Sequence, residues 1–155
     1  MNKYNIGNRE IKFRAWDSLL NEMIYLGDIS EIADRTFITE DQRESFWSNH
    51  IKPLQFTGLL DKNGKEIYEG DVFTVIFADC PNGFKMLGRD TQYIKNNGVV
   101  IKEKGSWVIS VEDETGEVMT SYLYQFLNKN PKEVIGNIFE NENLLTNKPN
   151  TGQGQ

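Results

Sequence analysis

The feature that constrains the fold most is a pair of strand-like runs joined by a two-residue turn, at residues 98–111. Residues 98–103 and 106–111 are rich in Val and Ile, and the second run carries Trp107. β-Branched and aromatic side chains pack well on a pleated sheet. Lys104-Gly105 between the runs suits a tight turn. The sequence therefore predicts an antiparallel hairpin here.

Five other segments have strand character. Ile11, Phe13 and Ala15 alternate with larger polar or amphipathic residues, which predicts a strand with one buried face. Residues 23–26 follow a turn and form its expected hairpin partner. Residues 72–77 are apolar on both faces, which predicts a central strand. Leu54 to Leu59 and Val134 to Phe139 supply the remaining predicted strands.

The rest of the chain indicates connections and little helix. Apolar residues follow no sustained period in residues 28–49 and 78–97. Ser121 could cap a short helix that begins directly after this residue. We therefore predict a mainly β fold with minor α structure: an SH3-like, partly open barrel with an N-terminal β-hairpin extension. The expected domains are an extension over residues 9–52, a barrel core over 53–145 and a disordered tail over 146–155.

Composition excludes several classes of site. The chain has 17 basic and 23 acidic residues, a net charge of −6, which disfavours non-specific binding to duplex nucleic acid. Cys80 is the single cysteine, so an internal disulfide and a multi-cysteine zinc site are both excluded. No apolar run approaches the roughly 20 residues that span a bilayer. We expect a cytoplasmic protein without a membrane partner.

Three phrases in this chain, at residues 11–17, 55–72 and 133–141, occur in an order and wording that resemble the YopX family of small bacteriophage and prophage proteins. The resemblance frames residues 9 to 145. It implies a β-rich fold with an SH3-like barrel, and a phage or prophage origin within a bacterial host. It implies no activity, and it transfers no catalytic residue to this chain.

The recognised central phrase has a structural interpretation. Gly58, Gly64 and Gly70 fall where turns require positive φ or close backbone approach. Tyr68 is expected to plug the barrel end, and Asp71 to cap a tight turn through backbone amides. A calcium loop starting at residue 61 is excluded, because the glycine and the bidentate glutamate that an EF-hand requires at its sixth and twelfth positions are absent.

Few residues could carry chemistry. Glu69 and Asp71 are separated by one residue and could form an acid–base pair or half of a metal site, although a structural role is favoured. His50 is the only histidine, and Cys80 has no neighbour that would stabilise a thiolate. We assign no catalytic, metal-binding or cofactor-binding residue, and we expect no cofactor.

Candidate interaction residues are clearer. Residues 83–104 form the one basic stretch, where Tyr93 interleaves with cations and could stack on single-stranded bases. Trp16 could anchor a protein partner. The interaction residues are Trp16, Lys85, Arg89, Tyr93 and Lys95.

The leading hypothesis is a non-enzymatic interaction or accessory protein that forms homo-oligomers through exposed strand edges and aromatics, with an unidentified phage or host protein as a further partner. A nucleic-acid-binding module that uses residues 85–104 is the alternative. A hydrolytic or metal-assisted enzyme built from Glu69, Asp71 or His50 comes third, and it requires at least two of these residues to meet in one pocket.

Overall fold

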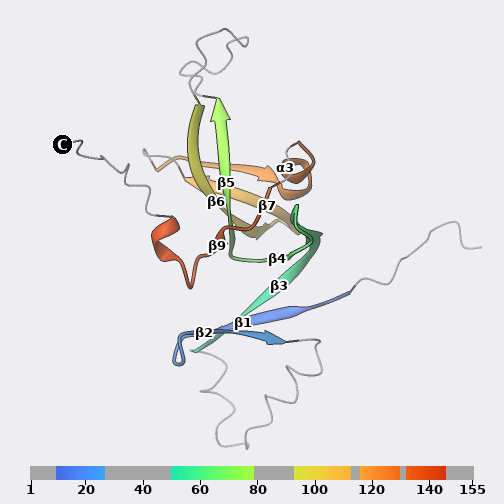
Figure 1. Cartoon of the computed structure of the whole chain (residues 1–155), viewed down its shortest axis with the longest axis vertical. Helices are drawn as coiled ribbons and strands as arrows, with labels where there is room; N and C mark the ends of the chain where they lie inside the picture. The colour runs from blue at the N-terminus through green and yellow to red at the C-terminus, as the bar shows by residue number, and fades with distance from the viewer. Residues whose placement is uncertain (1–9, 27–49, 79–92, 113–115, 130–131, 146–155) are drawn as a thin grey trace, which may run out of the picture. The chain divides into compact units, whose positions relative to one another are not determined.

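The computed structural model describes residues 10–26, 50–78, 93–112, 116–129 and 132–145 (Figure 1). The chain divides into two compact units, residues 1–69 and 70–155. Both are built from antiparallel sheets, so the prediction of a mainly β, barrel-like fold is confirmed. The division lies after residue 69, whereas the sequence pattern placed a boundary at 52/53, a point that a single continuous strand crosses.

The first unit contains a four-stranded sheet in the order β2-β1-β3-β4. Its strands are β1 (Phe13–Asp17), β2 (Glu22–Leu26), β3 (Ile51–Leu60) and β4 (Glu66–Tyr68). The predicted β1–β2 hairpin is confirmed. In its turn, the backbone N–H groups of Leu19 and Leu20 donate to Oδ1 of Asp17, at 2.8 and 3.1 Å. Asp17 thus organises the reversal that lets β2 pair with β1.

Strand β1 is buried on both faces, which corrects the prediction of one buried face. Arg14, Ala15, Trp16 and Asp17 are all less than 9% exposed. The reason is position: β1 lies between β2 and β3, and Arg14 places its guanidinium 4.9 Å from the centre of the Tyr68 ring. Stacking on an aromatic face allows a charged group to be buried where simple alternation predicts exposure.

The second unit contains a five-stranded sheet that curls into a half-barrel, in the order β8-β7-β6-β5-β9 (Figure 1). Its strands are β5 (Asp71–Ala78), β6 (Tyr93–Glu103), β7 (Ser106–Glu112), β8 (Val118–Tyr122) and β9 (Gly136–Asn137). Helix α3 (Leu123–Lys129) follows β8, and a 3-10 turn, η2 (Glu142–Leu144), follows β9. The 98–111 hairpin is confirmed as β6–β7, and the short helix as α3.

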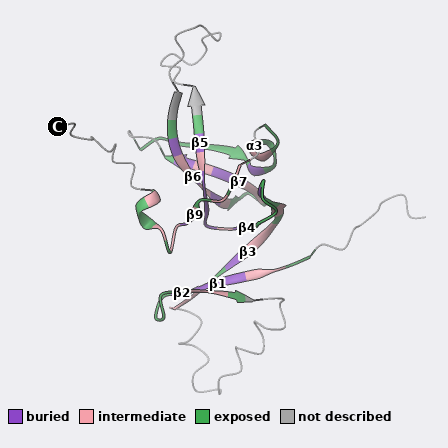
Figure 2. Cartoon of the chain, viewed as in Figure 1, coloured by how far each residue is buried: buried purple, intermediate pink, exposed green. Residues whose placement is uncertain are grey.

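The core of this unit is formed by buried residues of β5, β6 and β7. Phe73, Val100 and Ile109 are at most 2% exposed, and the ring of Phe73 meets that of Phe126 on α3 edge-on, with centroids 5.8 Å apart. Figure 2 shows the buried positions concentrated in the middle strands. Residues 72–77 were predicted to be buried on both faces, yet Ile76 is 54% exposed, so two-sided burial holds only near the start of β5.

Several predicted boundaries need correction. Leu54 lies in β3, which belongs to the sheet of the first unit, so the barrel-like sheet does not begin there. β6 begins at Tyr93, inside the stretch expected to be irregular. The strand expected over residues 134–139 contains only two paired residues. Ser121, the expected helix cap, lies within β8, and α3 begins two residues later at Leu123. The SH3-like assignment remains a prediction, and the predicted tail lies outside the described residues.

Gly98 lies where neighbouring side chains cover the backbone of β6 closely. A Cβ at this position would lie 2.8 Å from side-chain carbons of both Ile109 and Val111, and 3.0 Å from one of Val75. These distances are shorter than packed carbon atoms tolerate. The missing side chain on β6 therefore lets side chains from β5 and β7 meet across it.

Among the described residues, no helix combines the length and apolar character needed to cross a membrane.

Candidate interaction surface

The residues considered for chemistry do not form a described site. His50 and Glu69 lie in the first unit, and Asp71, which is 1% exposed, lies in the second. The backbone carbonyl of His50 accepts hydrogen bonds from the backbone and side chain of Ser18, at 2.9 and 3.1 Å. Within the described part of the chain, no three His, Cys, Asp or Glu side chains gather as a metal site would require. Cys80 lies outside the described residues.

The turn residues occupy strained or close-packed positions. Gly58, Gly64 and Gly70 have φ of 81°, 80° and 83°. At Gly70 there is a second constraint, because a Cβ would lie 3.1 Å from the ring of Phe139. Both the backbone conformation and the space thus favour glycine at this corner.

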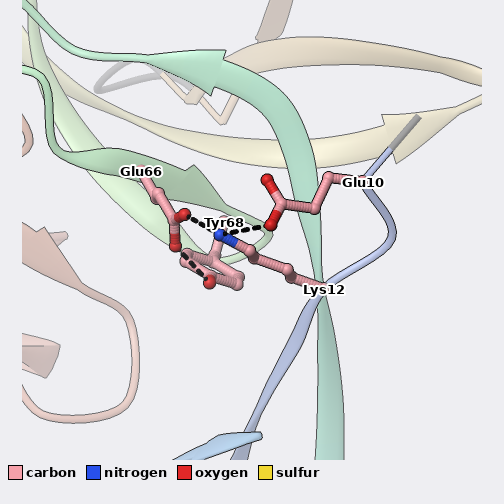
Figure 3. Close-up of polar contacts among 4 residues, drawn as sticks. All are labelled: Glu10, Lys12, Glu66 and Tyr68. Atoms are coloured by element: carbon pink, nitrogen blue, oxygen red, sulfur yellow. Dashed lines mark hydrogen bonds and ion pairs between the residues drawn. The ribbon is translucent and has the colours of Figure 1, made fainter. Parts of the chain in front are cut away.

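Tyr68 belongs to a polar cluster in the first unit (Figure 3). Its hydroxyl donates to Oε2 of Glu66 at 2.7 Å, and Nζ of Lys12 donates to Oε1 of the same carboxylate at 2.6 Å. Glu10 lies 3.0 Å from Nζ of Lys12 on the exposed side. Strands β1 and β4 are not neighbours in the sheet order, so this cluster joins the entry to β1 with β4 across β3.

The cluster shifts the ionisation of its members. Hydrogen bonds from Lys12 and then from Tyr68 hold the pKa of Glu66 below its usual value. Burial, followed by the hydrogen bond to Glu66, raises the pKa of the Tyr68 hydroxyl above its ordinary range. The hydrogen bonds to Glu66 and then Glu10 raise the pKa of Lys12. Each group is held in its neutral-pH state, which suits a structural clamp.

Tyr68→Phe is expected to lower the free energy of unfolding by about 1.5 kcal/mol at pH 7, because it removes a hydrogen bond to a charged acceptor. A depressed carboxyl pKa contributes stability above the group's ordinary pKa, 4.5, and loses it as pH falls through the folded value. The difference between variant and parent should therefore shrink in acid. Urea unfolding at pH 7 and pH 3 measures both effects.

Tyr25→Phe is the matched control, since Tyr25 is 65% exposed on β2 of the same unit. It should change stability by less than about 0.5 kcal/mol at either pH. Equal losses for the two variants would contradict the clamp.

The structure describes the side chains of two of the five predicted interaction residues, Trp16 and Lys95. Trp16 is 8% exposed, so its side chain is buried in this structure. Lys95 is exposed on β6, and the side chain of Tyr93 is not described. Lys85 and Arg89 lie outside the described residues. Of the remaining cations in the basic stretch, Lys102 places its ammonium 5.3 Å from the centre of the Trp107 ring. Roles for these five residues in binding remain predictions.

The surface that the sequence pattern missed is β8. All five of its residues are exposed, including Val118 at 57% and Tyr122 at 56%. Among the described strands, β8 pairs only with β7 and forms one edge of the sheet. The segment Val-Met-Thr-Ser-Tyr is β-prone and would have indicated a strand, but the preceding Asp-Glu-Thr-Gly turn and the helix expected from Ser121 obscured it.

A groove lies beside β8 in the second unit. It has a volume of about 400 Å³, and its described lining comes from β5, β7, β8, α3 and the residue Lys132. The lining includes Val75, Ile76, Ile109, Val111, Met119 and Phe126. The groove is thus mainly apolar, and three of its lining residues, Val75, Ile109 and Val111, are those that close over Gly98.

Comparisons with known proteins give a family and no activity. No curated protein matches the chain. Among solved structures, the crystal structure of protein EF1440 from Enterococcus faecalis is 23% identical, with a TM-score of 0.48, over 89% of this chain and 99% of that chain. The model of the family described as YopX protein matches residues 12–146. The chain therefore belongs to the YopX family, as its three motif phrases predicted.

Proposed function

We propose that this protein is a non-enzymatic interaction protein of phage or prophage origin, and that it self-associates by pairing β8 with β8 of a second copy. The observation that carries the proposal is the fully exposed edge strand β8. An edge strand presents unpaired N–H and C=O groups to any strand that can align with it.

The composition of β8 supports pairing. Proteins commonly protect an exposed edge with charged residues, proline or a bulge. Val118–Tyr122 contains no charged residue, no proline and no glycine. Its pairing with β7 is also regular, without a register shift from Val108↔Tyr122 to Glu112↔Val118. The edge is therefore regularly paired, uncharged and suited to a further strand.

The segment is also self-complementary. In an antiparallel pair centred on Thr120, Val118 of one copy lies opposite Tyr122 of the second, and Thr120 lies opposite Thr120. Aromatic–β-branched pairs and Thr–Thr pairs are both favourable across strands, each by roughly 0.2–1 kcal/mol. A two-fold axis through Thr120 uses each favourable pair in a closed dimer, the commonest symmetry among oligomers.

The test is the mass of the full-length protein as a function of concentration. Sedimentation velocity up to about 1 mM should show a reversible rise from 17.9 kDa towards twice that mass, with weak affinity because the contact is small. Hydrogen exchange should slow at the β8 amides that do not face β7 as the concentration rises. A strict monomer, or a dimer that leaves the β8 exchange unchanged, would contradict the proposal and leave a heterologous partner as the occupant.

A further inference from the structure

We infer that the groove beside β8 binds a small apolar monocarboxylate, a molecule with a hydrocarbon body and one anionic end. This inference does not require self-association, although Met119, Thr120 and Ser121 of β8 line the groove. The volume of the groove, about 400 Å³, falls in the range of about 300–1,000 Å³ that is typical of small-molecule sites. A site of that size with an apolar lining and few charged groups is the usual form of a ligand pocket.

The apolar floor is preformed by the sheet. Ile109 and Val111 on β7 are each 2% exposed, and Val75 on β5 is 5% exposed. Their side chains close over Gly98, where any Cβ would lie within 3.0 Å of all three. Phe126 forms part of the opposite wall from α3 and is held by its edge-on contact with Phe73. A hydrocarbon body placed here would contact side chains that are already fixed by packing.

Charge decides the class of ligand. Lys129 and Lys132 line the groove, Lys129 exposed and Lys132 half-buried, and none of the described lining residues is acidic. This local excess of positive charge stands in a chain of net charge −6. Two ammonium groups beside an apolar floor complement one anionic group attached to a hydrocarbon body. A polyanion would gain little from the floor, and a neutral hydrocarbon would gain nothing from the lysines.

Octanoate is the probe, and 1-octanol is its uncharged counterpart. Met119 lines the groove, whereas Met23 lies on β2 of the other unit, so the methyl groups of methionine report binding by position. With ¹³C-methyl-methionine protein, octanoate should shift the Met119 signal in a saturable manner and leave the Met23 signal in place. 1-Octanol should also shift the Met119 signal in a saturable manner, with lower affinity than octanoate.

The double variant Lys129→Gln, Lys132→Gln should weaken octanoate binding about tenfold and leave octanol binding unchanged, because it removes only the charge interaction. Raising the salt concentration should reproduce part of that loss in the parent protein. The inference is overturned if the Met119 signal does not saturate, if Met23 shifts in step with it, or if the double variant weakens octanol and octanoate equally. Each of these results would count against the groove inference alone, because none of them measures self-association through β8.

Discussion

Thr120→Lys is expected to abolish self-association over the concentration range where the parent dimerises. The two-fold axis places the two Thr120 side chains directly opposite, where Cβ atoms lie about 4.5–5.5 Å apart. Loss of the Thr–Thr pair costs up to ~1 kcal/mol, and two ammonium groups at close range in water add ~1 kcal/mol. The dissociation constant should therefore rise about 30-fold. Sedimentation velocity of the full-length variant measures the change.

Three controls make this test specific to the register. Thr120→Val keeps a β-branched residue at the axis and should still dimerise. Leu60→Lys adds the same charge at an exposed position of the first unit, 54% exposed, and should leave the dimer intact. An equimolar mixture of Thr120→Lys and Thr120→Glu should recover association, because unlike charges then meet at the axis. Failure of the mixture to associate, with both variants folded, would rule out pairing centred on Thr120.

Phe73→Ala is expected to cost about 3–5 kcal/mol of unfolding free energy, the range for removing a buried aromatic side chain. Phe73 is fully buried on β5 and holds Phe126 of α3 by an edge-on contact. The variant loses both the apolar burial and the aromatic pair, and it leaves a cavity beneath the helix. Urea unfolding followed by circular dichroism should show a midpoint lower by roughly 2 M, given typical slopes of about 1–3 kcal/mol/M.

Ile76→Ala on the same strand is the comparison. Ile76 is 54% exposed, so its truncation should cost less than about 1 kcal/mol. Similar losses for the two variants would mean that β5 is not buried as described. A small loss at Phe73 would contradict its place in the core of the second unit.

The two candidate surfaces differ in how far sequence reasoning could approach them. Interaction through a strand edge was expected, but no pattern identified which strand forms the edge. That depends on sheet order, which places β8 beyond β7 with no described strand on its outer side. The groove could not be foreseen, because Val75, Ile109 and Phe126 are far apart in the chain and meet only when the sheet curls. A binding role for Lys129 and Lys132 could be inferred only after the structure placed them beside the apolar lining of the groove.

The amino-acid sequence by itself determined the local features. Alternation and β-branched runs specified the β1–β2 and β6–β7 hairpins, turn glycines matched positions of positive φ, and motif wording identified the family. These properties depend on neighbouring residues, and therefore on short-range sterics. Only the tertiary structure decided that β3 joins the sheet of the first unit, that Arg14 is buried against Tyr68 and that Ile76 is exposed. Those outcomes depend on which surfaces meet after the chain folds, and a linear pattern does not contain that information.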